Sequence, residues 1–145
     1  MEGCVFCGIV VGREPASFVY RDEVVVAFLG HRPVTRGHTL VIPRQHATHL
    51  ADMDEETGAH LFRVTMRVAA AIRRAAVRAD GIRLALSDGR AAGQAVMHVH
   101  MHVIPRYSGD GVWGGEMEGR RQATRAELDE TAEEIARAYR QLYGL

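Results

Sequence analysis

An alternation of histidine with apolar residues constrains this chain more than any other feature. The run 98–104 reads His-Val-His-Met-His-Val-Ile, and a period of two is that of a β-strand rather than a helix. We predict a strand over 96–104 that is closed by Pro105, because proline cannot donate to a strand ladder. Three imidazoles then share one face of the strand, and the opposite face packs on the core through Val99, Met101 and Val103.

Other apolar runs bounded by turn residues predict four further strands. They are expected over 18–20 and 24–29, which form a hairpin, and over 39–42 and 82–86. The segment 88–93 is expected to be a loop.

Capping signals predict two helices. The first is expected to begin at Asp52 or Asp54 and to end near Ala79, with Gly81 as its left-handed stop. The second begins at Thr124, where Thr-Arg-Ala-Glu fits a capping box.

The order of these elements indicates the fold class. Strands grouped around two helices, without regular alternation, predict an α+β fold with an antiparallel sheet of about five strands. A length of 145 residues suits a single domain. We divide the domain 1–145 into a core over 1–107, a flexible glycine-rich loop over 108–122 that carries Trp113, and a C-terminal helix over 123–145.

The charge balance limits the class of partner. Eighteen basic residues, all arginine, balance eighteen acidic ones, so the net charge is zero. This argues against a nucleic-acid or membrane-surface binder, and local groups must hold any anionic ligand. No apolar run approaches the length of a spanning helix, and the first residues lack a signal-peptide pattern. We therefore expect a cytoplasmic protein.

The alternating histidines permit two functional interpretations. The simpler, non-functional interpretation is a strand whose solvent-facing side chains happen to be histidines. In one, the three side chains hold a catalytic zinc ion. In the other, one imidazole attacks phosphorus while its neighbours place protons and charge. Alternate residues lie roughly 6.6–6.8 Å apart along a strand. Three imidazoles on one straight strand therefore splay too far for a single metal.

Cys4 and Cys7 form a C-x-x-C pair, which alone permits a redox pair, a disulfide or two zinc ligands, against the simpler interpretation of a free thiol pair. A redox pair would sit beside a βαβ pattern, which is missing here. A structural disulfide does not suit a cytoplasmic setting. Zinc binding and a free thiol pair therefore stay open, and zinc would require two further ligands.

Taken together, these motifs resemble the histidine triad (HIT) superfamily. The alternating run matches the triad, and Gly93-Gln94 lies upstream of it. The runs 28–29, 37–46 and 104–106 match as well. Cys4 and Cys7, followed by Gly-Ile-Val, resemble the zinc-carrying bacterial members. The resemblance covers roughly residues 4–107 and implies the HIT-like sheet with one long central helix.

The resemblance implies roles for individual residues at the reaction centre. His100 is the implied nucleophile, which forms a covalent nucleotidyl-histidine at the α-phosphate. His102 is implied to contact the phosphate or the leaving group, with His38 as its proton-relay partner. The implied substrate-binding residues are Gln94, Gly93, Ser87 and Ala95.

The resemblance also implies a structural zinc ion, with no metal required for the chemical step. Its ligands would be Cys4, Cys7, His46 and His98, and His49 is the alternative to His46. A homodimer is implied, through the long helix and its adjoining strand.

The chain departs from the family pattern at three positions. Gly30 stands where members usually carry an aspartate that resembles a ribose ligand, while Ser87 replaces an asparagine and Ala95 a serine or threonine. His31 offers a substitute polar contact, although a solvent-facing histidine is the simpler interpretation. We expect His60, early in the long helix, to be solvated.

The implied function is a hydrolase or transferase for a small nucleotide-like phosphate ligand. The substrate would be a nucleoside phosphoramidate, a nucleotidyl ester or a dinucleoside polyphosphate. Two alternatives are a catalytically weak nucleotide-binding module and a metal-dependent hydrolase that uses the histidine cluster directly.

Overall fold

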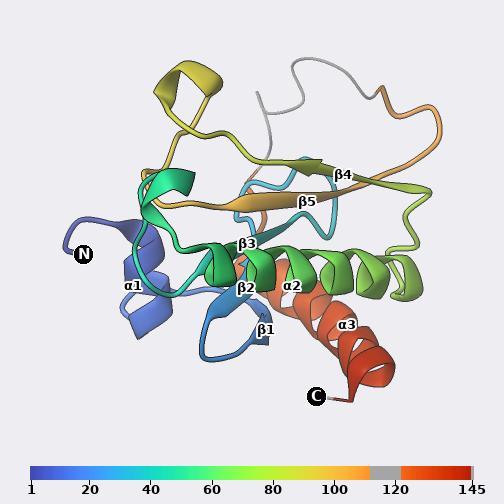
Figure 1. Ribbon diagram of the computed structural model, residues 1–145. Helices are drawn as coiled ribbons and strands as arrows, with labels where there is room; N and C mark the ends of the chain where they lie inside the picture. The colour runs from blue at the N-terminus through green and yellow to red at the C-terminus, as the bar shows by residue number, and fades with distance from the viewer. Residues whose placement is uncertain (112–121, 145) are drawn as a thin grey trace.

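A computed structural model describes residues 1–111 and 122–144. Five antiparallel strands form one sheet in the order β1-β2-β3-β5-β4 (Figure 1). The α+β class and the five-stranded sheet are therefore confirmed. Most of the loop predicted over 108–122, including Trp113, lies outside the described residues. The strands are β1 Phe18–Arg21, β2 Val25–Leu29, β3 Thr39–Pro43, β4 Gly81–Ala85 and β5 Met101–Arg106; the helices are α1 Val5–Val11, α2 Glu55–Arg74 and α3 Arg125–Tyr143, with short 3-10 turns at Leu50–Asp52 and Arg90–Ala92.

Helices cover both faces of the sheet. The larger core joins α2 and α3 to one face through alternate residues of β2 and β3, such as Val25, Ala27 and Val41. The opposite face carries Phe28 and Leu40 with their neighbours, and α1 packs on it. Every residue of β2 and β3 is buried as a result. This two-sided burial explains why both strands read as continuous apolar runs.

The β1–β2 hairpin is closed by Asp22. Its carboxylate accepts hydrogen bonds from the backbone of Val24 and Val25, at 2.8 and 2.9 Å. It also accepts from the Tyr20 hydroxyl at 2.9 Å and lies 2.6 Å from Nε2 of His60 on α2. His60 is therefore held in a hydrogen-bonded cluster, and the expectation of a solvated side chain was wrong.

Both predicted helix starts are confirmed, but one end is not. Asp54 caps α2 through the Thr57 amide, and Thr124 caps α3 in a reciprocal capping box. Helix α2 stops at Arg74, earlier than predicted, because Val77 turns back into the core. The positive φ lies at Arg78 rather than at Gly81, which instead begins β4.

Strand β5 differs from its prediction at both ends. It begins at Met101, so His98 and His100 precede it in an irregular segment, and it continues through Pro105 to Arg106. The early residues leave the ladder because the His98 ring turns toward the two cysteines. Pro105 is tolerated within β5 because β3 pairs with β5 only as far as Val103. Beyond that point the Thr35 hydroxyl donates to the Pro105 carbonyl at 2.6 Å.

Candidate functional site

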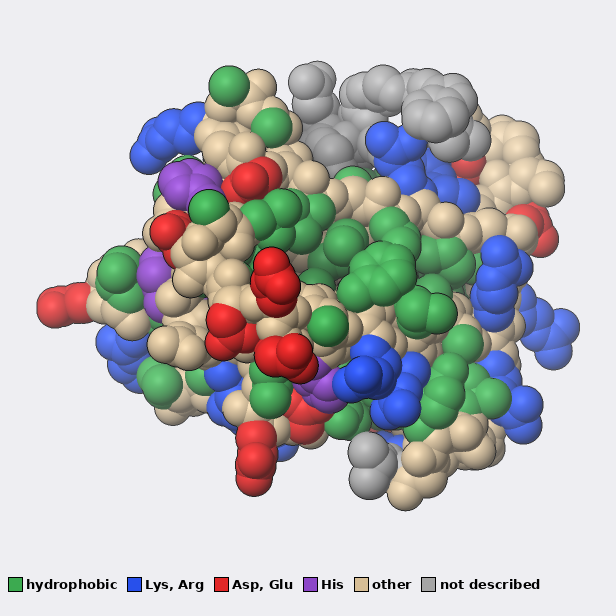
Figure 2. Space-filling model, in the orientation of Figure 1, with side chains coloured by type: hydrophobic (Ala, Val, Ile, Leu, Met, Phe, Trp, Pro, Cys, Tyr) green, Lys and Arg blue, Asp and Glu red, His purple; other side chains and the backbone are tan. Residues whose placement is uncertain are grey.

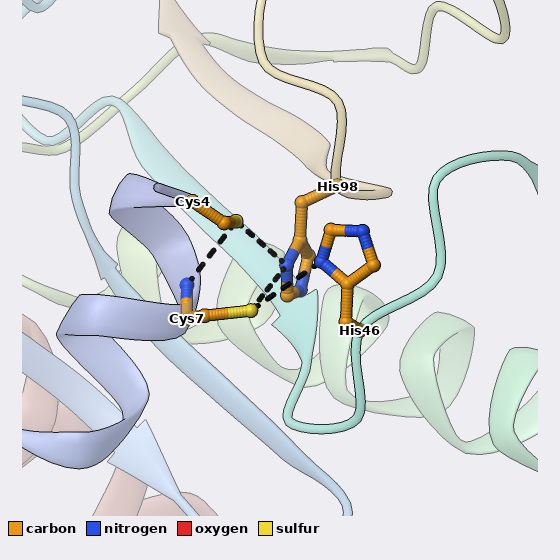
Figure 3. Close-up of side chains that lie close together, drawn as sticks. All are labelled: Cys4, Cys7, His46 and His98. Atoms are coloured by element: carbon orange, nitrogen blue, oxygen red, sulfur yellow. Dashed lines mark hydrogen bonds between the residues drawn. The ribbon is translucent and has the colours of Figure 1, made fainter. Parts of the chain in front are cut away.

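Four sulfur and nitrogen ligands from three separate segments converge at one end of the sheet (Figure 3). Cys4 caps α1 and Cys7 lies one turn further along it. His46 comes from the loop after β3, and His98 from the segment before β5. The four ligand atoms all lie within 4.8 Å of one another. The structure therefore brings together the four predicted metal ligands.

The spacing of these atoms fits a tetrahedral zinc site. Zn–S bonds of about 2.3 Å and Zn–N bonds of about 2.0–2.1 Å place sulfur and nitrogen about 3.6 Å apart in a regular tetrahedron. Cys4 Sγ lies 3.4 Å from His98 Nδ1, and Cys7 Sγ lies 3.6 Å from the same atom. Cys7 Sγ also lies 3.3 Å from His46 Nδ1. Two thiols and two imidazoles are a donor set that structural zinc prefers.

The second nitrogen of each imidazole is also engaged. His98 Nε2 lies 2.8 Å from the Pro43 carbonyl, which can only accept, so this nitrogen carries the proton. Nδ1 of His98 is then the lone-pair nitrogen, and it faces the thiols. Burial, together with the charges of nearby His46 and His100, lowers the pKa of His98 to about 4, although the hydrogen bond to Pro43 opposes the shift. His98 is thus neutral near pH 7, as a metal ligand must be.

The alternative third ligand does not reach the cluster. His49 sits at the start of a 3-10 turn, where its ring lies 3.6 Å from the Asp52 carboxylate. His46, in contrast, lies against Cys7 Sγ, and its Nε2 lies 3.2 Å from the Thr48 hydroxyl. The geometry favours His46.

His100 is held in one tautomer by the backbone of a cluster residue. Its Nδ1 lies 2.8 Å from the His98 carbonyl, so Nδ1 carries the proton and Nε2 keeps the lone pair. Burial lowers the pKa of His100, although the hydrogen bond to that carbonyl opposes the shift. The imidazole is therefore neutral near pH 7, with one unprotonated nitrogen that can act as a nucleophile.

His38 and His102 form a directed pair beside His100. The Val34 amide donates to His38 Nδ1 at 3.1 Å, so the proton of neutral His38 lies on Nε2. That nitrogen lies 2.9 Å from His102 Nδ1, which must accept. His102 then carries its proton on Nε2. Since the His100 and His102 rings are 5.1 Å apart, a lone pair and a proton donor lie side by side.

These imidazoles line a cavity of about 290 Å³, near the lower end of the roughly 300–1,000 Å³ typical of small-molecule sites. Ser87, Gly93 and Ala95 line the same cavity. Gly93 has a φ of 96°, and a Cβ built there would lie 3.7 Å from the Ser87 hydroxyl.

Gln94, the remaining predicted substrate residue, is buried and bound to the backbone. Its Oε1 accepts from the Gly89 amide at 2.7 Å, and its Nε2 donates to the carbonyls of Thr48 and Val96 at 2.8 and 3.0 Å. The side chain thus ties the loop before β5 to the segment that carries His46.

Sequence reasoning missed the part of the cavity formed by α1. Val5, Phe6 and Ile9 line it, and the Phe6 ring meets the His100 ring edge-on at 5.2 Å. The helical spacing of positions 5, 6 and 9, next to two cysteines three residues apart, was the available signal. Arg32 and Arg125 were also missed, and they line the cavity together with Gly30 and His31.

Comparison with known proteins agrees with this geometry. A Zn-bound histidine triad family protein from Mycobacterium smegmatis superposes with a TM-score of 0.86 and 42% identity, covering 98% of this chain and 96% of its own. A hypothetical histidine triad nucleotide-binding protein from Sulfolobus tokodaii gives a TM-score of 0.86 and 36% identity, over 96% and 93% of the two chains.

Sequence comparisons add a relative with a named activity and a matching family model. The adenylylsulfatase HINT3 of Arabidopsis thaliana is 34% identical over 113 residues, which are 78% of this chain and 57% of the plant protein. The family model of the HIT domain matches residues 11–109. This protein therefore belongs to the HIT family.

Proposed function

We propose that this protein cleaves a nucleotidyl substrate at its α-phosphate through a covalent nucleotidyl-His100 intermediate. The substrate class is a nucleoside phosphoramidate, a nucleotidyl ester or a dinucleoside polyphosphate. The observation that carries the proposal is the placement of the His100 lone pair beside the proton-bearing His102, in one cavity. The names of the similar proteins, an adenylylsulfatase and a nucleotide-binding protein, support the substrate class.

In the first step, His100 Nε2 attacks phosphorus. An N–P bond forms, the bond from phosphorus to the leaving atom breaks, and its electron pair departs with the leaving group. The His102 Nε2–H donates a hydrogen bond to the leaving atom, and in a phosphoramidate it transfers its proton to the leaving nitrogen, which departs as a neutral amine. The positive charge that appears on the His100 ring is stabilised by the Nδ1–H bond to the His98 carbonyl.

In the second step, water attacks phosphorus and releases the nucleotide. The N–P bond breaks, its electron pair returns to His100 Nε2, and the water proton passes to His102 Nε2 when that atom has protonated the leaving group, and otherwise to solvent. Backbone amides around Gly93, in the loop that lines the cavity, are the groups that we assign to the phosphate oxygens. Such donors require no net positive charge.

We also propose that Cys4, Cys7, His46 and His98 hold Zn²⁺ in a structural role. When bound, the ion links α1 to the segment that carries the nucleophile, and it takes no part in bond making. The competing metal-hydrolase mechanism would need His100 and His102 as ligands. A ligand nitrogen must turn a lone pair to the metal, whereas His102 Nε2 carries its proton because its Nδ1 accepts from His38.

We further propose a homodimer through α2 and β4. Phe62 and Met66, one turn apart on α2, are 46% and 59% exposed, and Leu84 on the edge strand β4 is 40% exposed. Figure 2 shows hydrophobic side chains gathered across the middle of this face. A surface of this kind is typical of an association site.

In the described residues, no helix is long and apolar enough to span a membrane.

One observation favours the alternative of a catalytically weak nucleotide-binding module. The cavity contains Gly30 where family members usually carry an acid, so a ribose diol has no carboxylate partner at that position. In this alternative, a nucleotide binds and no adduct forms.

Trapping the intermediate separates these mechanisms. The protein is quenched during turnover of adenosine 5′-phosphoramidate labelled at phosphorus, and the label is mapped by peptide analysis. We expect label on His100 and none in His100→Ala, while His49→Ala, which changes a histidine outside the cavity, labels normally. Turnover that persists in His100→Ala would refute the mechanism. Activity that chelation abolishes, with no adduct at any stage, would identify a metal hydrolase.

A further inference from the structure

Gln94 is buried next to the cavity without lining it. The residue is only 5% exposed, whereas its neighbours Gly93 and Ala95 both line the cavity. A glutamine side chain has two N–H donors, and here both are used, in the bonds to the carbonyls of Thr48 and Val96. Gln94 therefore has no N–H left to offer a substrate, and its role must lie in the backbone groups that it binds.

The Gln94 side chain closes the loop whose amides the proposed function assigns to phosphate. Its Oε1 accepts from the Gly89 amide at 2.7 Å, while its own backbone amide donates to the Gly89 carbonyl at 3.1 Å. We call residues 87–95 the phosphate loop. Because Gly93 and Ala95 flank the anchored residue, these two bonds fix the part of the phosphate loop that borders the cavity.

The same side chain reaches the segment that carries His46. Gln94 Nε2 donates to the Thr48 carbonyl at 2.8 Å, and the Thr48 hydroxyl lies 3.2 Å from His46 Nε2. When His46 Nδ1 binds a metal, Nε2 carries the proton and the hydroxyl accepts it. A hydrogen bond of this kind orients a ligand imidazole. Thr48 therefore contacts both a metal ligand and Gln94.

Gln94 also reaches the segment that carries His98. The Val96 carbonyl accepts from Gln94 Nε2 at 3.0 Å and from the His98 amide at 2.9 Å. A more exposed link runs in parallel, from the Leu50 amide to the Asp88 carboxylate at 3.1 Å. The phosphate loop and the segments of both imidazole ligands thus meet at one buried amide side chain.

We propose that Gln94 is a positioning residue that couples the metal cluster (Cys4, Cys7, His46 and His98) to the phosphate loop, so that a metal ion and a phosphate ligand strengthen each other's binding. This inference rests on the proposed function, which assigns phosphate to that loop. Each bound partner restricts the segments that Gln94 joins, so the second partner loses less conformational entropy when it binds. Because such coupling is reciprocal, a nucleotide should raise the affinity for zinc by the factor by which zinc raises the affinity for the nucleotide.

The experiment measures the zinc affinity of the full chain by competition with a chromophoric chelator, with and without saturating adenosine 5′-monophosphate. In the parent, the nucleotide should raise the zinc affinity by on the order of fivefold or more. Gln94→Met keeps the length of the side chain and removes its three hydrogen bonds. The variant should bind the nucleotide about tenfold more weakly in calorimetry, and its zinc affinity should not respond to the nucleotide.

Gln45→Met is the matched control, because it makes the same substitution on an exposed side chain next to His46. It should keep the nucleotide affinity and the zinc response of the parent. A Gln94→Met variant with the zinc response of the parent would overturn the coupling, as would a parent that binds the nucleotide without a change in zinc affinity. Both results leave the proposed function intact, whereas a parent that does not bind the nucleotide would contradict the proposed function and the coupling with it.

Hydrogen exchange on the zinc-loaded parent keeps the proposal falsifiable if Gln94→Met does not fold. In the described part of the chain, no residue of 44–50 lines the cavity, so we expect no direct contact of the nucleotide with this segment. The coupling nevertheless predicts slower exchange of its amides when adenosine 5′-monophosphate binds. Protection at 87–95 with unchanged exchange at 44–50 would overturn the coupling.

Discussion

The Asp22 cluster allows the free energy of one half-buried interaction to be calculated and then measured. Burial raises the pKa of the Asp22 carboxyl, but hydrogen bonds from His60, the Val25 and Val24 amides and Tyr20 outweigh it and lower the pKa to about 2, from an ordinary 3.8. The side chain is 22% exposed, so solvent screening discounts the effect little. The difference corresponds to about 2 kcal/mol of stability that depends on the charge.

Because the pKa of the folded state is the lower one, this stability is complete above pH 4–5 and is lost as the pH falls toward 2. Between pH 7 and pH 3, about 1 kcal/mol of it should disappear. Asp22→Asn resembles the protonated carboxyl in shape and lacks the charge. We expect the variant to be about 2 kcal/mol less stable at pH 7 and only about 1 kcal/mol less stable at pH 3.

Urea unfolding at pH 7, 5, 4 and 3 measures this convergence. Chelator is present throughout, so that any bound metal is removed equally from both proteins. Glu133→Gln is the control, because this exposed carboxylate pairs with exposed Arg140 and should change stability by less than about 0.5 kcal/mol at every pH. A constant difference between Asp22→Asn and the parent from pH 7 to pH 3 would refute the electrostatic reasoning.

Three further predictions concern the metal, the nucleophile and the dimer. The purified protein should hold close to one zinc ion per chain, and the Cys7→Ser variant less than about half of one. Chelation should lower the melting temperature of the parent and leave that of the variant unchanged, whereas a metal-free parent would contradict the site. Phe6→Leu removes the edge-on contact with the His100 ring, so kcat should fall about tenfold with little change in KM or in zinc content. An unchanged kcat would show that the Phe6 ring does not position the nucleophile. Phe62→Glu should convert a dimer to a monomer in sedimentation analysis while the equally exposed control Leu50→Glu does not, and a parent that sediments as a monomer would rule out the proposed interface.

Local signals account for the features that could be predicted. Capping residues such as Asp54 and Thr124 act within one turn of their helices, so the sequence alone places those helix starts. The apolar runs of β2 and β3 reflect burial on both faces of the sheet. The assembly of the four metal ligands followed from the family resemblance, since C-x-x-C alone names no further ligand.

The errors arose where tertiary contacts override a local pattern. The period of two predicts a strand through His98, but attraction of that ring to the cysteine cluster takes the residue out of the ladder. Helix α1 went unpredicted because its seven residues, Val-Phe-Cys-Gly-Ile-Val-Val, include Gly8 and several β-branched residues, which are poor helix formers. His60 is bonded to Asp22, 38 positions away, a contact that no local pattern encodes.

The three alternating histidines have different environments because the backbone bends between them. His98 turns its side chain to the cysteines and offers its carbonyl to His100, so one residue joins the metal cluster to the nucleophile. His102 begins the regular pairing of β5 with both neighbours, which places its ring against His38 on β3. A straight strand would have given all three rings equivalent surroundings. The bend produces a buried ligand, a nucleophile and a proton donor from one repeated residue type, and it requires that the segment around His98 be held firmly. The contacts of Cys4, Cys7 and Pro43 with the His98 ring provide that support.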